Sequence, residues 1–64
     1  MNETIKIWLE KLYENEIEET KGTLDNEILW AMAQGDKEQV SIHFENIALL
    51  KEYIEVLKEL KNNI

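Results

Sequence analysis

The chain has 64 residues and a net charge of −7, which results from 14 acidic residues and seven lysines. It contains no cysteine, no proline and only two glycines, Gly22 and Gly35. These counts exclude a disulfide scaffold and a cysteine-ligated metal site, and the length limits residues 1–64 to one small domain. A hydrophobic content of 44% is ordinary for a folded domain and too high for charge-driven disorder.

The first predicted element is a helix over residues 3–33. Eight of its residues, all apolar except Thr20, share one helix face by their spacing of mainly three and four. They are Ile5, Leu9, Leu12, Ile17, Thr20, Leu24, Ile28 and Ala31. An alternative three-helix domain would break at Lys21–Thr23, where Thr23 is a suitable helix cap. We favour one continuous helix because the apolar phase does not change across Gly22, and one interior glycine costs only about 1 kcal/mol.

A tight turn is predicted at residues 34–36, between two helical stretches. Gly35 is expected to adopt the left-handed conformation that commonly follows a helix end. Asp36 is expected to cap the next helix and, with Gln39 three residues later, to form a capping box.

The second predicted helix covers residues 37–61. Its main apolar stripe again has spacings of three and four, the pattern of a buried helix face. The stripe consists of Val40, Phe44, Ile47, Leu50, Ile54, Leu57, Leu60 and Ile64. A second stripe, at a spacing of seven, consists of Ile42, Leu49 and Val56. A helix with two apolar stripes normally contacts more than one neighbour.

The two stretches predict an all-α antiparallel hairpin. When the chain is folded at the turn, paired residue numbers add up to about 71, so that Ile17 meets Ile54 and Leu24 meets Ile47. A rise of about 1.5 Å per residue gives a rod about 40 Å long. Two helices cannot cover all of these apolar stripes by themselves, so we expect two copies to pair into a homodimeric four-helix bundle.

Little in the sequence points to catalysis. The chain has no arginine, no glycine-rich phosphate loop and no Ser/His/Asp set, so we expect no enzyme activity, no cofactor and no metal site. His43 is the only histidine, and Val40 stands where a Glu-x-x-His metal motif needs a glutamate. We interpret His43 as a packed or partly exposed residue of the bundle. A pH-sensitive packing role stays open.

The acidic residues are densest at Glu14, Glu16, Glu18 and Glu19. We interpret this run as a solvated helix face or as a contact for a basic partner. The alternative function is therefore an acidic mimic of nucleic acid that binds the basic cleft of another protein. The charge argues against direct binding to nucleic acid or to an anionic membrane. Without a signal-peptide pattern or an apolar span, we expect a cytoplasmic protein.

Outward aromatic and aliphatic residues are the candidate interface. Tryptophan and tyrosine are over-represented in binding hot spots. The candidate residues are Trp30, Leu29, Ile42, Phe44, Trp8 and Tyr53. The sequence thus predicts a small acidic interaction or regulatory module. Its first expected partner is a second copy, and a basic protein or one with an apolar groove is a further possibility.

Overall fold

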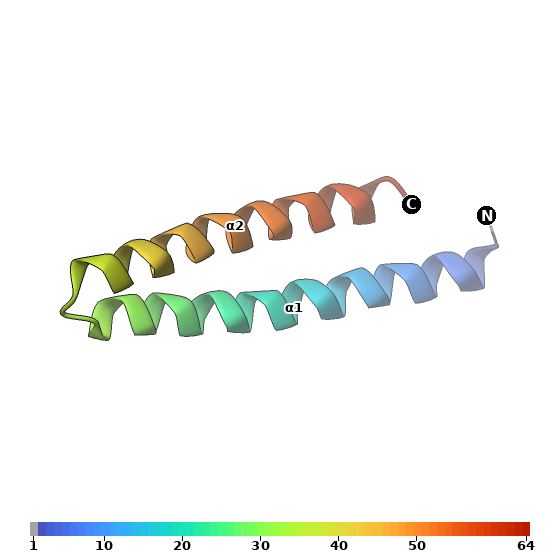
Figure 1. The fold of residues 1–64 in the computed structure, drawn as a ribbon. Coiled ribbons are helices and arrows are strands. Elements are labelled where there is room, and N and C mark those ends of the chain that lie inside the picture. Colours follow the sequence, from blue (N-terminus) through green and yellow to red (C-terminus); the bar gives the residue numbers. More distant parts are fainter. Residues whose placement is uncertain (1) are drawn as a thin grey trace.

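The computed structural model describes residues 2–64, which form two helices joined by a short turn (Figure 1). Helix α1 spans Glu3–Ala33 and helix α2 spans Lys37–Asn62. They pack side by side and antiparallel, which confirms the predicted all-α hairpin, and α1 passes through Gly22 without a break. The molecule is 51 Å long, more than the predicted 40 Å, because α1 extends beyond the end of α2 (Figure 1).

Side-chain caps fix where each helix begins. The side chain of Asn2 accepts a hydrogen bond from the Thr4 amide at 2.8 Å at the start of α1. Asp36 accepts one from the Glu38 amide at 2.8 Å, which confirms its predicted role as the cap of α2. Both bonds satisfy amides that lack a partner in the first turn of a helix.

The predicted left-handed glycine cap is wrong, because no residue from 2 to 64 has a positive φ angle. Helix α1 instead ends where Gln34 turns to an extended conformation, with φ −78° and ψ 135°. The Gln34 amide still donates to the Trp30 carbonyl at 3.2 Å. The extended residue ends the helix, so that Gly35 does not need a left-handed conformation.

A small core lies midway along the hairpin. Ile17 of α1 packs with Ile54 and Leu57 of α2, and Tyr13 and Leu24 cover this cluster. The adjoining Thr20 is also buried, and its hydroxyl donates to the Glu16 carbonyl at 2.7 Å. This local bond lets a polar side chain lie between the helices without an unsatisfied group.

Several residues predicted on the packed faces are exposed. They are Ile5 (47%), Leu12 (63%), Phe44 (61%) and Leu60 (45%). In a helix pair the inward positions repeat about every seven residues, and in α2 this repeat falls on His43 and Lys61, both half-buried. The prediction selected neighbouring apolar residues where a polar side chain occupies the inward position.

The hairpin leaves much apolar surface in contact with water. Its accessible surface is 5066 Å², whereas a compact protein of 7.6 kDa has about 4,300 Å². The difference, about 800 Å², reflects two outward sides that a single pair of helices does not cover.

Candidate functional site

One broad side of the hairpin carries most of the exposed large apolar residues. We call it the apolar face. Eight of the thirteen exposed large hydrophobic side chains lie on it, with exposures of 45–63%. They are Ile5, Leu12 and Trp30 of α1 and Ile42, Leu49, Tyr53, Val56 and Leu60 of α2.

The seven-residue repeat places these side chains on one side of each helix. In α2 the inward positions are occupied by Ile47, Ile54 and neighbours in the same repeat, and the apolar-face residues flank them on one side at spacings of three and four. In α1 the residues that flank the inward positions on one side also recur at spacings of three and four, and Glu16 is one of them. The Tyr53 hydroxyl of α2 donates to Glu16 Oε1 of α1 at 3.1 Å. This bond shows that the two flanking stripes lie on the same side of the hairpin.

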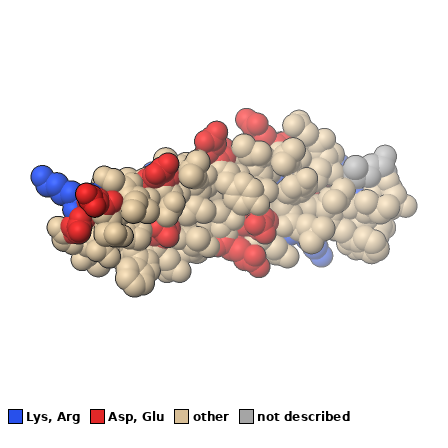
Figure 2. Space-filling view, in the orientation of Figure 1, with Lys and Arg blue, Asp and Glu red and all other residues tan. Residues whose placement is uncertain are grey.

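The two halves of the apolar face differ in polarity. On α2 the stripe is apolar from Ile42 to Leu60 except at Asn46. On α1 it is apolar near both ends but polar in its middle. The polar positions are Glu16, Glu19, Thr23 and Asn26. No lysine occupies the stripe positions of either helix, and Figure 2 shows a broad surface that is mainly uncharged, with scattered acidic groups and basic atoms only near its margins.

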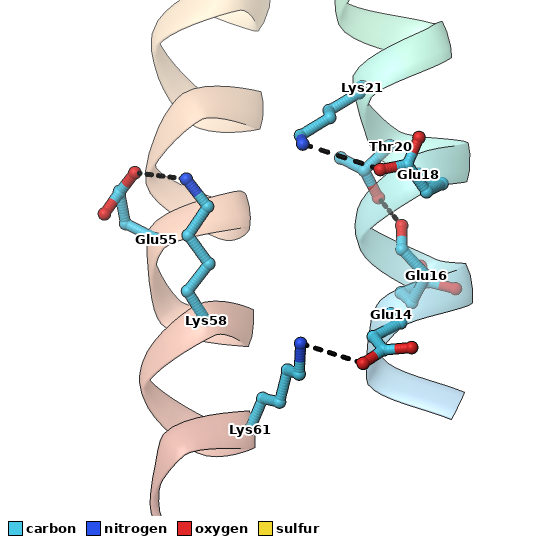
Figure 3. Close-up of polar contacts among 8 residues, drawn as sticks. All are labelled: Glu14, Glu16, Glu18, Thr20, Lys21, Glu55, Lys58 and Lys61. Atoms are coloured by element: carbon cyan, nitrogen blue, oxygen red, sulfur yellow. Dashed lines mark hydrogen bonds and ion pairs between the residues drawn. The ribbon is translucent and has the colours of Figure 1, made fainter. Parts of the chain in front are cut away.

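The opposite side of the hairpin is a charged surface, which we call the ion-pair face. Lys61 Nζ lies 3.0 Å from Glu14 Oε1 and joins α2 to α1 (Figure 3). The other two pairs, Lys21 with Glu18 at 3.5 Å and Lys58 with Glu55 at 3.4 Å, each lie within one helix (Figure 3). Exposed ion pairs of this kind each contribute about 0–1 kcal/mol, so this face is solvated rather than a source of stability.

The structure separates the predicted interface residues into three groups. Trp30, Ile42 and Tyr53 lie on the apolar face. Trp8 and Leu29 are exposed along the outer edge of α1, the side away from α2. Phe44 lies on the ion-pair side, where it lines a shallow groove of about 330 Å³.

Five members of the apolar face are not among the predicted interface residues: Ile5, Leu12, Leu49, Val56 and Leu60. The signal that locates Leu49 and Val56 is the seven-residue spacing from Ile42. The sequence predicts this spacing as a second stripe, but of its three members only Ile42 is a predicted interface residue.

The acidic run does not form one continuous surface. Glu14 and Glu18 line the same groove on the ion-pair face, together with Lys21 and Lys61. Glu16 instead points toward Tyr53, and Glu19 lies in the polar middle of the α1 stripe. The run is thus divided between two sides of the helix, and lysines neutralise part of it.

Two hydrogen bonds between the helices involve titratable groups. His43 Nδ1 lies 2.8 Å from Glu27 Oε2, with only 16% and 24% of the two side chains exposed. The hydrogen bond from His43 is the main cause that lowers the pKa of Glu27 below its ordinary value. At the other contact, the hydrogen bond to Glu16 raises the pKa of Tyr53, because it stabilises the protonated phenol.

Within residues 2–64, no group of three or more histidine, aspartate or glutamate side chains is arranged to hold a metal ion. None of the helices in this part of the chain combines the length and apolar character needed to cross a membrane. Comparison of the sequence with protein-family models and with curated proteins finds no match, and comparison with solved structures finds none either.

Proposed function

We propose that this chain is a homodimeric protein–protein interaction module in which two hairpins pack through their apolar faces into a four-helix bundle. The observation that carries the proposal is the gathering of eight large apolar side chains, each 45–63% exposed, on one broad side. Burial of apolar surface contributes about 25 cal/mol per Å², and it is the main favourable term in association.

The size of this side fits a second copy. The hairpin measures 51 Å by 15 Å in its two longer dimensions, a footprint of about 770 Å². A stable protein–protein interface buries about 800 Å² on each partner. Pairing of two such faces also removes the surface excess of the single hairpin and gives each stripe a neighbour of the same shape.

The acidic-mimic alternative receives less support. Such a mimic presents a continuous array of carboxylates to a basic cleft. Here Glu14 and Glu18 lie in ion pairs with lysines, and Glu16 accepts a hydrogen bond from Tyr53. A cytoplasmic location, the lack of catalysis and the lack of nucleic-acid or membrane binding stay predictions from the sequence.

A matched pair of substitutions tests the proposal. Leu49 and Phe44 are equally exposed apolar residues of α2, at 58% and 61%, but they lie on opposite sides of the hairpin. Leu49→Glu places a charge in the proposed interface, whereas Phe44→Glu places one outside it. We expect light scattering to give the dimer mass for Phe44→Glu and the mass of a single chain for Leu49→Glu. The proposal fails if Leu49→Glu keeps the dimer mass, or if Phe44→Glu dissociates the dimer as Leu49→Glu does.

A further inference from the structure

We infer that the two hairpins pack with their turns at opposite ends of the bundle. In this arrangement α2 packs antiparallel along α2 of the partner, and α1 packs antiparallel along α1 of the partner. This inference rests on the proposed dimer and specifies how its two copies recognise each other. Two identical faces can meet by a twofold rotation in only two simple ways. In one, the turns lie at the same end and α1 covers the partner's α2. In the other, the turns lie at opposite ends.

The α2 stripe is complementary to an antiparallel copy of itself. When facing residue numbers add up to 102, every stripe position of one helix meets a stripe position of the other. Ile42 then faces the partner's Leu60, and Leu49 faces the partner's Tyr53. Asn46, the one polar residue of the α2 stripe, faces the partner's Val56. The result is a continuous apolar contact along the whole stripe, with the knobs-into-holes spacing of paired helices.

The α1 stripe matches itself in the same manner when facing numbers add up to 42. Leu12 faces the partner's Trp30, so apolar residues meet near both ends. In the middle, Glu16 faces the partner's Asn26 and Glu19 faces the partner's Thr23. Amide and hydroxyl groups can donate hydrogen bonds to these carboxylates.

The registers of the two seams agree with the hairpin itself. Contacts within the hairpin pair residues whose numbers add up to about 71, as in the packing of Ile17 with Ile54. Each α1 residue therefore lies beside the α2 residue whose number is 71 minus its own. When facing α2 residues add up to 102, the α1 residues beside them add up to about 40, which is twice 71 minus 102. The α1 seam needs a sum of 42. A shift of each α1 along its own hairpin by about one residue, or about 1.5 Å, gives this sum.

The alternative with both turns at the same end also pairs apolar residues near the ends of the stripes, where Leu12 faces the partner's Leu60 and Trp30 faces the partner's Ile42. It places unlike residues together in the middle. The polar middle of α1 then lies on the apolar middle of the partner's α2. Glu16 faces the partner's Val56, and Thr23 faces the partner's Leu49. Burial of a carboxylate against an aliphatic side chain is unfavourable because the charge loses water without gaining a partner. The sorting of polar and apolar residues along the two stripes therefore favours turns at opposite ends.

The arrangement has a functional consequence. Both termini of a hairpin lie at the end away from its turn (Figure 1). With the turns at opposite ends, the termini of the two copies also lie at opposite ends of the bundle. Such a dimer holds whatever is attached to its two chains apart by its full length.

Spin labels at the turn measure the arrangement directly. The chain has no cysteine, so Gly35→Cys gives a single labelling site, and a Cβ added there meets no atom within 4 Å beyond the adjacent residues. With turns at opposite ends, we expect an electron–electron distance of about 42–48 Å between copies, from about 28–32 residues of helix rise. With turns at the same end, the distance is roughly 10–20 Å, as for neighbouring helices. Mixed dimers of Gly35→Cys and Asn63→Cys chains give the opposite result. With turns at opposite ends, residue 35 of one copy lies near residue 63 of the partner, so the distance between their labels is short.

The outcomes separate the two proposals. A long distance for Gly35→Cys, together with a short distance in the mixture, supports the inference. A short distance for Gly35→Cys alone overturns it and leaves the dimer intact. If light scattering of the labelled protein shows only single chains and no distance between labels appears, the proposed dimer itself is wrong.

Discussion

The Tyr53 hydroxyl donates a hydrogen bond to the Glu16 carboxylate at 3.1 Å and thereby links the apolar stripe of α2 to the polar middle of the α1 stripe. This single contact establishes that the two stripes share one side of the hairpin. It also places a titratable phenol in the proposed interface, where its ionisation can be measured.

Removal of the Glu16 charge should lower the pKa of Tyr53 toward its ordinary value. The bond to Glu16 raises that pKa, because an ionised phenol would lose the bond and meet a like charge. Ultraviolet titration of Glu16→Gln in a Tyr13→Phe background, compared with Tyr13→Phe alone, measures the change for Tyr53 only. An unchanged titration curve would show that the two groups do not interact in solution. The raised pKa also means that this contribution to stability is complete below the pKa of the unfolded chain and is lost as the pH rises through the folded value.

Replacement of His43 should raise the pKa of Glu27. The hydrogen bond from His43 Nδ1 lowers that pKa from its ordinary value of 4.5. The bond therefore contributes stability above about pH 4.5, and the contribution is lost as the pH falls through the lowered value. A carboxyl-carbon NMR titration of His43→Gln against the unmodified chain should show Glu27 titrating at higher pH in the variant. Equal titration midpoints would contradict the contact, and Glu16, on the same helix, is an internal control.

Gly22→Ala should stabilise the hairpin. Gly22 lies inside α1 with an ordinary negative φ angle, and an added side chain meets no other atom within 4 Å. Alanine restricts the unfolded chain and favours the helix by about 0.5–1 kcal/mol. Thermal unfolding followed by circular dichroism should give a higher midpoint than for the unmodified chain at the same concentration. A lower midpoint would indicate that α1 is not a regular helix at this residue.

Added salt should strengthen the dimer. Each chain carries a net charge of −7, so two copies repel each other at long range, whereas the proposed contact is mainly apolar. The screening length falls from about 30 Å at 0.01 M to about 8 Å at 0.15 M ionic strength. Sedimentation equilibrium over this range should show a decreasing dissociation constant. A complex held together by attraction between opposite charges would weaken under the same change.

The elements themselves could be predicted from the sequence. The capping residue Asp36 and the unbroken apolar phase across Gly22 indicate two long helices and the turn between them. Both are local signals, because they depend on neighbouring residues and on the period of one helix.

The side of the hairpin on which an outward residue lies was harder to predict. Phe44 and Trp30 are both apolar and both close to the turn, but they face opposite sides. The distinction depends on which residues point inward, and in α2 one inward position is occupied by His43, whose polarity hides the repeat. Its contact with Glu27 on the other helix makes that position acceptable, and a pattern within one helix does not contain this information.

The molar mass of the unmodified chain shows whether two hairpins pair in solution. Light scattering behind size exclusion, over at least a hundredfold range of concentration, measures whether the apolar face finds a second copy. We expect a mass of about 15 kDa, twice the 7.6 kDa of one chain, that persists until dilution dissociates the dimer. A mass of 7.6 kDa at every concentration would contradict the homodimer.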